Sequence, residues 1–209
     1  MKISIIPEIL MYKILQKYFG YTSFYPLQED IINEVLGRKD VFVLMPTGSG
    51  KSLCYQMPAL LFDGVTVVLS PLIALMKDQV DGLLANGVPA TFINSSLSYS
   101  EIDARRRSLS NNEVKILYIA PERLMMPEFL QFLQGLKVSL FAIDESHCIS
   151  EWGHDFRPEY RQLNVLKEKF PGVPVMALTA TATPVVEGDI ITQLKLSGCK
   201  VFKASFNRK

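Results

Sequence analysis

The sequence predicts an α/β fold in which a mostly parallel central sheet carries helices on both faces. Short runs rich in β-branched residues alternate with helical segments along the chain. These runs are apolar at nearly every position instead of every second one, as in strands that are buried on both faces of a sheet. The first run leads directly into a glycine-bearing loop followed by Lys51 and Ser52, which is the order that a phosphate-binding loop requires.

Seven short apolar runs are the predicted strands, at residues 41–44, 65–69, 91–93, 114–119, 140–143, 173–178 and 200–204. The predicted helices lie before and between them, at residues 7–18, 27–36, 52–61, 72–86, 100–109, 127–133, 160–169 and 184–194. The crossovers between parallel strands should be right-handed. No internal repeat, low-complexity tract or linker interrupts this order, so we expect one domain over residues 1–209.

Composition restricts the class of protein. With 48% hydrophobic and 21% charged residues, the 209-residue chain is typical of a soluble globular domain, and its net charge of +1 favours no class of partner. Cys54, Cys148 and Cys199 show no paired spacing, which indicates reduced thiols in an intracellular protein. No cleavable leader or membrane-spanning apolar run is evident. We therefore expect a cytoplasmic (nucleoid) location, or a nuclear one if the source is eukaryotic.

The loop at residues 45–52 indicates nucleotide binding. Gly48 and Gly50 let the backbone turn its N–H groups around a phosphate, and the next helix directs its positive N-terminal end at the same anion. Lys51 supplies a cation for the β- and γ-phosphates of ATP, and the Ser52 hydroxyl supplies a ligand for Mg²⁺. Met45 stands where the strict pattern has glycine. The residues expected to hold the nucleotide here are Thr47, Gly48, Ser49, Gly50, Lys51 and Ser52.

A second motif, which is acidic, completes the predicted ATP site. Asp144 and Glu145 directly follow a buried strand, and ligands bind at the carboxyl ends of strands in open α/β sheets. Asp144 is expected to hold Mg²⁺, and Glu145 to position or activate the attacking water. A GTPase-like binding module is disfavoured, because no Asn-Lys-x-Asp sequence is present to read guanine.

Aromatic residues and a glutamine precede the phosphate-binding loop by about one helix. The Gln28 amide offers both a donor and an acceptor to an adenine edge, and the Tyr21 ring can stack on the face of the base. Packing at a helix N-terminus would explain the same residues, so both interpretations stay open at this point.

The stretch Asp144-Glu145-Ser146-His147, continued through residues 148–160, resembles the RecQ family of ATP-dependent DNA helicases. Six more segments resemble that family's motifs in the family's order, namely the region of Gln28 and residues 45–52, 70–79, 118–124, 177–182 and 206–208. The family tolerates the residue found at Met45. The resemblance implies a P-loop NTPase fold of the RecA-like type and the first, ATP-binding lobe of a helicase.

The resemblance also assigns a role to the aromatic loop at residues 150–160. In the RecQ family this loop senses single-stranded DNA and couples it to ATP hydrolysis, and His147 is expected to link the ATP site to the DNA. Aromatic side chains offer stacking worth ~1–3 kcal/mol per base. An ordinary surface loop anchored to the core by its tryptophan is the alternative. The expected nucleic-acid contacts are Lys77, Arg123, Trp152, His154, Phe156 and Arg157.

Two positions depart from the family pattern. Tyr25 stands where the family usually has arginine beside the nucleotide, so the contact there is expected to be altered. Glu151 stands where the family usually has glutamine, which adds a negative charge to a loop that should approach DNA. We hypothesise from this charge that Glu151 weakens the coupling between DNA binding and hydrolysis.

Two other groups of residues could suggest sites. His147, Cys148 and His154 fit no common structural zinc spacing and lack an evident fourth ligand, so no zinc site is predicted. The run Arg105-Arg106-Arg107 could contact nucleic acid, but a run of charges on a helix is more often a solvated face.

The resemblance implies a lobe of a 3′–5′ DNA helicase that acts in repair, recombination or replication, with ATP and Mg²⁺ as cofactors and DNA as partner. A second lobe, a zinc module and any C-terminal domain are expected to lie outside this chain, which ends directly after a predicted strand. Because the arginine finger of such motors comes from the second lobe, little turnover is expected here. The alternatives are a DEAD-box-like RNA helicase lobe and a nucleotide-dependent nucleic-acid-binding module without turnover.

Overall fold

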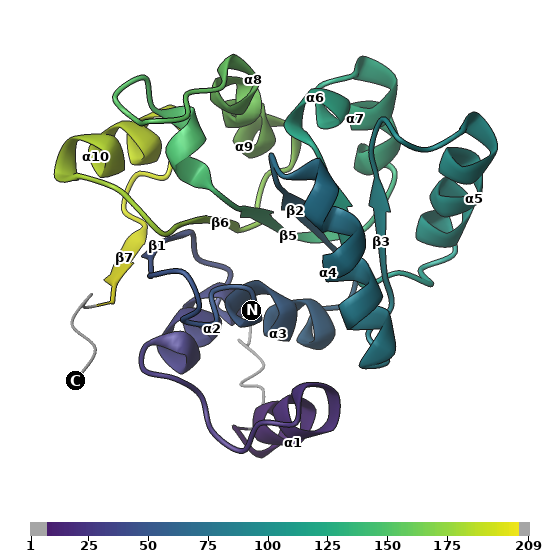
Figure 1. Ribbon diagram of the computed structural model, residues 1–209, viewed down its shortest axis with the longest axis horizontal. Coiled ribbons are helices and arrows are strands. Elements are labelled where there is room, and N and C mark those ends of the chain that lie inside the picture. The colour runs from purple at the N-terminus through teal and green to yellow at the C-terminus, as the bar shows by residue number, and fades with distance from the viewer. Residues whose placement is uncertain (1–7, 205–209) are drawn as a thin grey trace.

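The computed structural model describes residues 8–204 and contains a seven-stranded, fully parallel sheet with the strand order β3-β4-β2-β5-β6-β1-β7 (Figure 1). Its strands are β1 Val41–Leu44, β2 Val65–Leu69, β3 Ala90–Ile93, β4 Ile116–Ile119, β5 Val138–Ile143, β6 Val175–Thr179 and β7 Lys200–Lys203. The α/β class predicted from the sequence is confirmed, and the sheet is parallel throughout because every strand returns through a helical crossover.

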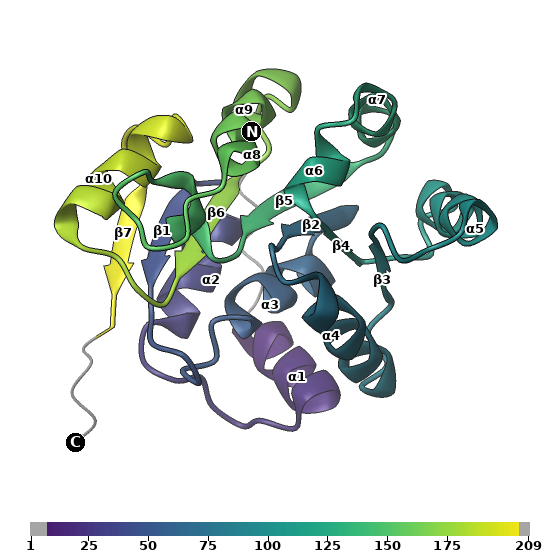
Figure 2. The same ribbon diagram turned by 45° about the horizontal axis from the view of Figure 1, so that its top comes forward.

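Helices cover both faces of the sheet (Figures 1 and 2). One face carries α2 Gln28–Leu36, α3 Leu53–Leu61 and α4 Ile73–Ala85, with α1 Glu8–Phe19 packed on the outside of α2 and α3. The opposite face carries α5 Tyr99–Ser110, α6 Pro121–Leu124, α7 Pro127–Gln134, α8 Pro158–Arg161, α9 Val165–Lys169 and α10 Pro184–Gln193. Short 3₁₀ turns, η1 Ser146–Ile149 and η2 Gln162–Asn164, complete the second layer.

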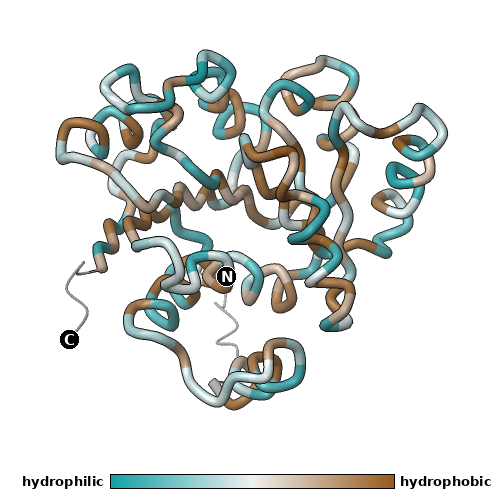
Figure 3. Tube along the Cα trace, in the orientation of Figure 1, coloured by the Kyte–Doolittle hydropathy of each residue, from teal (hydrophilic) through white to brown (hydrophobic). Residues whose placement is uncertain are grey.

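The side chains of β1 show why the strands read as continuous apolar runs. Phe42 and Leu44 belong to the core under α5–α10, whereas Val41 and Val43 belong to the core under α2–α4. Successive side chains of a strand point to opposite faces, so a strand between two helical layers needs apolar residues at every position. Figure 3 shows this hydrophobic character along the central strands.

The predicted strands and helices are present within the described residues, with differences at their ends. The strand predicted at 114–119 begins at Ile116, because the N–H groups of Lys115 and Ile116 both donate to the Pro89 carbonyl in an irregular start. The helix predicted at 7–18 begins in the structure at Glu8, since residue 7 lies outside the described part. The motif predicted at 206–208 also lies outside it.

The helix predicted at 160–169 is three short pieces, α8, η2 and α9, and it starts earlier, at Pro158. Proline at the first helical turn has no N–H to lose, so it begins α8 and, at Pro121, also the unpredicted α6. Residues 146–149 were not predicted as helical, and they form η1 directly after Glu145. Both omissions concern elements of one turn, which carry too little periodic signal to be predicted.

The strand order places the predicted motifs at one edge of the sheet. β6 lies between β1, which precedes the phosphate-binding loop, and β5, which precedes Asp144. The carboxyl ends of these three parallel strands therefore open on one site. Among residues 8–204, no helix is both long and apolar enough to cross a lipid bilayer.

Gly64→Ala should destabilise the chain by about 2 kcal/mol or more, because residue 64 has φ +127° and an added Cβ would clash with the Lys137 carbonyl oxygen. Urea unfolding followed by circular dichroism would measure the change. Gly82→Ala is the matched control, since residue 82 is helical and an added Cβ there meets nothing within 4 Å. This variant should leave stability unchanged or raise it by about 0.5–1 kcal/mol. Equal losses of stability in the two variants would contradict the expected clash at residue 64.

Candidate functional site

The loop after β1 is shaped for an anion. Gly48 and Gly50 both have φ +77°, a left-handed conformation that favours glycine. The Lys51 ammonium donates hydrogen bonds to the carbonyls of Met45 at 3.0 Å and Pro46 at 3.3 Å, so it lies folded over its own loop. A phosphate in the loop would offer this ammonium charged oxygens in place of two neutral carbonyls.

The Gln28 side chain supports this loop by a hydrogen bond to its backbone. The side chain is 1% exposed, its Nε2 donates to the Gly50 carbonyl at 3.0 Å, and its Oε1 accepts from the Tyr25 N–H at 2.8 Å. An added Cβ at Gly50 would clash with the same Nε2. Reading adenine with Gln28 would therefore require an exchange of these backbone hydrogen bonds, and that role stays a prediction.

A pocket of about 390 Å³ opens beside the loop, of a size that suits a nucleobase and sugar. It lies between the Phe19–Gln28 region and the start of α3. Tyr21 and Tyr25 both line it and are 56% and 62% exposed, so their ring faces are available for stacking. The structure thus brings Tyr25, the departure from the family pattern, into the same pocket as Tyr21, Gln28, Gly50 and Ser52.

Asp144 and Glu145 lie at the carboxyl end of β5. The Asp144 N–H still donates to the Leu69 carbonyl at 2.8 Å, and the Tyr160 hydroxyl donates to the Asp144 carbonyl at 3.2 Å. Glu145 has φ +49°, an uncommon conformation for a residue with a side chain, and its N–H donates to Asp144 Oδ1 at 3.0 Å. Strained backbone of this kind clusters at functional sites.

The two carboxyl groups differ in their electrostatic environment. Burial, assisted by the charge of Glu145, raises the pKa of Asp144 to about 6. The hydrogen bond with His147 lowers the pKa of Glu145 below its usual value. Burial therefore disfavours the charged form of Asp144, and a nearby cation would offset that cost.

The donor set fits a magnesium ion. Asp144 and Ser52 line one small cavity of about 70 Å³, together with Ser70, Gln79 and several apolar or aromatic residues. Carboxylate and hydroxyl oxygens are ligands that Mg²⁺ accepts, usually with water and substrate phosphate completing its shell. Assignment of Mg²⁺ here stays a prediction that these oxygen atoms support.

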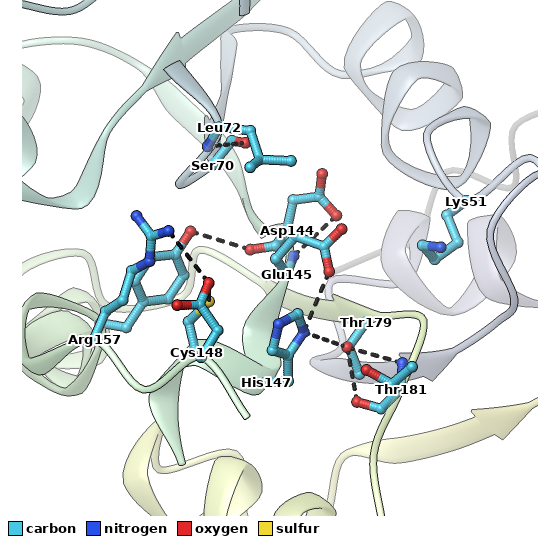
Figure 4. Close-up of polar contacts among 12 residues, drawn as sticks. Lys51, Ser70, Leu72, Asp144, Glu145, His147, Cys148, Arg157, Thr179 and Thr181 are labelled. Atoms are coloured by element: carbon cyan, nitrogen blue, oxygen red, sulfur yellow. Dashed lines mark hydrogen bonds and ion pairs between the residues drawn. The ribbon is translucent and has the colours of Figure 1, made fainter. Parts of the chain in front are cut away.

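His147 connects the acidic motif to β6 (Figure 4). Its Nδ1 lies 2.9 Å from Thr179 Oγ1 and 3.2 Å from Glu145 Oε2. Thr179 Oγ1 donates to the Thr181 carbonyl at 3.1 Å and accepts from its N–H at 3.2 Å. The Thr179 carbonyl accepts from the Met45 N–H at 3.1 Å, so one buried threonine is joined to the acidic motif and to the phosphate-binding loop.

The aromatic loop after η1 presents its rings to solvent. Trp152 is 75% exposed and Phe156 is 36% exposed, which is against the alternative that the tryptophan anchors the loop to the core. The His154 ring stacks on His147 with a centroid distance of 4.5 Å, which places the loop against the acidic motif. A Cβ at Gly153 would lie 2.7 Å from the His147 carbonyl oxygen, so this tight turn requires glycine.

Arg157 lies on the other side of the loop. Its Nη2 pairs with Asp155 at 3.2 Å, and its Nη1 lies 3.5 Å from the Pro71 carbonyl, in the segment after β2. Its partners are therefore a loop residue and the neighbouring motif after β2.

The other predicted nucleic-acid contacts lie near the same edge of the sheet. Lys77 on α4 is exposed and pairs with Asp81 at 2.7 Å. Arg123 on α6 donates to the Met126 sulfur at 3.3 Å. Both pairs are weak enough to be exchanged for a phosphate. In contrast, Arg105 and Arg106 lie over the rings of Phe92 and Phe132, and Arg107 pairs with Asp103.

The sequence did not indicate two residues that hold the loop. The buried Tyr160 connects α8 to Asp144, and Arg161 forms an ion pair with Glu151. Glu151, read from the sequence as an added charge facing DNA, is neutralised by this arginine. Tyr160 lies 16 residues from Asp144 and Arg161 lies 10 residues from Glu151, and no sequence pattern marks either as a partner.

A cluster of possible metal ligands differs from the set considered from the sequence. Asp155 joins His147 and Cys148, with ligand atoms within 4.8 Å of one another. Asp155, however, already accepts from Arg157, and burial raises the pKa of the Cys148 thiol to about 12, which keeps it neutral. The prediction that these residues bind no zinc stays a prediction. Cys54, Cys148 and Cys199 are all free thiols, as the sequence predicts.

Thr179→Val should lower the free energy of unfolding by about 1–3 kcal/mol, because it leaves the buried His147 Nδ1 and the Thr181 N–H without their hydroxyl partner while preserving the side-chain shape. Urea unfolding would measure it. Thr192→Val is the control, since the exposed Thr192 hydroxyl only donates to the Gly188 carbonyl. Similar losses in the free energy of unfolding at both positions would show that the Thr179 hydroxyl contributes no more to stability than an exposed one.

The model of the DEAD/DEAH box helicase family matches residues 25–188. The chain is 50% identical over 205 residues to an ATP-dependent DNA helicase RecQ of Haemophilus influenzae, covering 98% of this chain and 33% of that protein. A protein of the same name from Bacillus subtilis is 50% identical over 198 residues, covering 94% of this chain and 34% of that protein.

A solved structure supports the fold. The hypothetical ATP-dependent RNA helicase from Sulfolobus tokodaii matches with a TM-score of 0.71 at 18% identity, covering 93% of this chain and 57% of that one. Identity at this level shows the α/β fold alone. The chain spans about a third of the length of the curated relatives it matches.

Proposed function

Since the chain belongs to the DEAD/DEAH box helicase family, we propose that it is the first RecA-like lobe of a RecQ-type helicase, which binds ATP and single-stranded DNA and couples ATP hydrolysis to strand translocation and unwinding. The observation that carries the proposal is the chain of contacts from Glu145 through His147 to Thr179, with the aromatic loop stacked on the same histidine. A residue that would act on the attacking water is thus in contact with the segment that would meet DNA.

On the ATP side, residues 47–52 surround the phosphates and Lys51 exchanges its two carbonyl partners for phosphate oxygens. Tyr21 and Tyr25 flank the base and sugar in the adjoining pocket. Mg²⁺, held by Ser52 and Asp144, would neutralise charge that develops on the β- and γ-phosphates. The buried charge of Asp144 supports this assignment, because a cation offsets its cost.

Glu145 orients the water that attacks the γ-phosphorus. The bond from this phosphorus to the β,γ-bridging oxygen breaks, ADP leaves with that electron pair, and the water proton passes to Glu145 or to a phosphate oxygen. The hydrogen bond from His147 holds the Glu145 carboxylate in one orientation. A change at His147 therefore changes the position of the water.

On the DNA side, Trp152 and Phe156 provide exposed rings on which bases stack without sequence preference. Lys77 and Arg123 provide positive charge to the phosphates from the segments after β2 and β4. Binding that depends on such phosphate contacts should weaken as salt concentration rises. Movement of the loop on DNA binding would reach Glu145 through His154 and His147.

The complete motor needs a second RecA-like lobe, which would supply an arginine finger and close over the ATP. Loss of such a finger can cost ~10³–10⁵ in turnover. Translocation would run 3′ to 5′, in DNA repair, recombination or replication, in the bacterial nucleoid or the nucleus. A DEAD-box-like RNA helicase lobe is less favoured, because the relatives at 50% identity are named DNA helicases. Binding without turnover is the alternative for this chain on its own.

Lys51→Ala should weaken binding of a fluorescent ATP analogue by about tenfold or more, because it removes the charge that meets the β- and γ-phosphates. Fluorescence titration of the 209-residue chain would measure the dissociation constant. Lys195→Ala is the matched control, since Lys195 is exposed and pairs only with Glu168 in the described contacts. Wild-type affinity in Lys51→Ala would refute the proposed phosphate site.

ATP turnover by the 209-residue chain should stay near background with and without single-stranded DNA, because the second-lobe arginine is not part of it. Phosphate release would be measured in both conditions, with Lys51→Ala to identify contaminating activity. DNA-stimulated turnover that disappears in Lys51→Ala would contradict the need for a second lobe.

Competition between single-stranded DNA and RNA of equal length would test the RNA alternative.

A further inference from the structure

Arg161, the last residue of α8, contacts the aromatic loop and α10 at the same time. Its Nη1 donates to Glu151 Oε1 at the start of the loop. Its guanidinium lies 5.7 Å from the centroid of the Phe156 ring, and its Nη2 lies 3.8 Å from Asp189 Oδ1 on α10. In Figures 1 and 2 the loop before α8 runs beside α10, so a single side chain joins the two segments.

The α10 side of this contact is the more buried one. The Asp189 side chain is only 15% exposed, and within residues 8–204 both its Oδ2 and the Arg161 Nε are buried without a hydrogen-bond partner. The guanidinium and this carboxylate carry opposite charges, which offsets part of the cost of burying them. The neighbouring Tyr160 is fully buried and bonded to the Asp144 carbonyl, so α8 itself is held firmly.

The loop side carries the hydrogen bond of Arg161 and is more exposed. The Glu151 side chain is 56% exposed, and the Arg161 side chain is 31% exposed. Exposed ion pairs and cation–π contacts each contribute little, but here both act on the loop from the same guanidinium. The loop is therefore held to a rigid base by contacts that can be broken without unfolding it.

We propose that Arg161 is a positioning residue that holds the aromatic loop ready for single-stranded DNA, with Glu151 as its partner on the loop. The proposal rests on the proposed function of the loop. It gives Glu151 the opposite role to the one that its charge suggested, since the carboxylate fastens the loop and is neutralised by Arg161. A loop that is ordered before binding loses less conformational entropy when DNA arrives.

This arrangement also gives the loop a second connection to the segment after β6. The first runs through His147 to Thr179, inside the ATP site. The second runs through Arg161 to Asp189 on α10, the helix that follows the Thr179–Thr181 segment. Two connections restrain the loop against rotation about either one, so the backbone that carries Phe156 and Trp152 is restrained relative to the ATP site.

Trp152 is the only tryptophan of the chain, which makes its fluorescence a direct reporter of the loop. Steady-state anisotropy of Trp152 would be measured in the 209-residue chain and in Glu151→Gln, Arg161→Gln and the double variant. We expect lower anisotropy in each variant, with the double variant no lower than Arg161→Gln, because both single changes break the same contact. Glu168→Gln and Arg107→Gln, which break exposed pairs elsewhere, are the matched controls and should leave anisotropy unchanged.

Glu151→Gln keeps the Arg161–Asp189 pair, so it reports on the loop even if Arg161→Gln loses stability. Titration with an unlabelled thymidine oligonucleotide, followed by Trp152 emission, should require about fivefold more DNA for half-saturation in Glu151→Gln and Arg161→Gln. Unchanged anisotropy in Glu151→Gln, or additive losses in the double variant, would overturn the proposal. If the Trp152 emission of the wild-type chain does not change when DNA is added, the proposed function is refuted instead. The anisotropy comparison would still test whether Arg161 and Glu151 hold the loop.

Discussion

The structure depends on the burial of a parallel sheet between two layers of helices. Strands such as β1 must be apolar at every position, because alternate side chains enter different cores. The same parallel arrangement brings the carboxyl ends of all strands to one edge. The phosphate-binding loop, the acidic motif and the Thr179 segment thus share that edge, although they lie far apart in the sequence. The chemistry proposed for the site follows from this placement.

At that edge, β6 connects the phosphate-binding loop with the acidic motif because it lies between their two strands. The Thr179 carbonyl meets the Met45 N–H, and its hydroxyl meets His147. A buried hydroxyl bonded on both sides has few alternative positions, because each lost hydrogen bond costs free energy in the low-dielectric interior. A small displacement of Met45 or of His147 should therefore move Thr179 and be passed on to the other residue.

The aromatic loop combines exposed rings with a rigid base. Gly153 allows the tight turn, His154 stacks on His147, and Arg161 joins the loop to α10. Exposed rings on a restrained loop suit a surface that must bind any base sequence. The weak contacts of Arg161 with Glu151 and Phe156 would set how much order the loop has before DNA arrives.

The sequence by itself determined the α/β class and the seven strands, and it predicts the residues proposed to carry the chemistry, because apolar runs and the order of motifs are local properties of the chain. It did not place the one-turn elements α6 and η1, which have too few residues to show a period. Only the tertiary structure decided which side chains pair: Gln28 with the loop backbone, His147 with Thr179, and Arg161 with Glu151 and Asp189. Such pairs depend on how strands and helices come together in space, and a single sequence carries no record of that proximity.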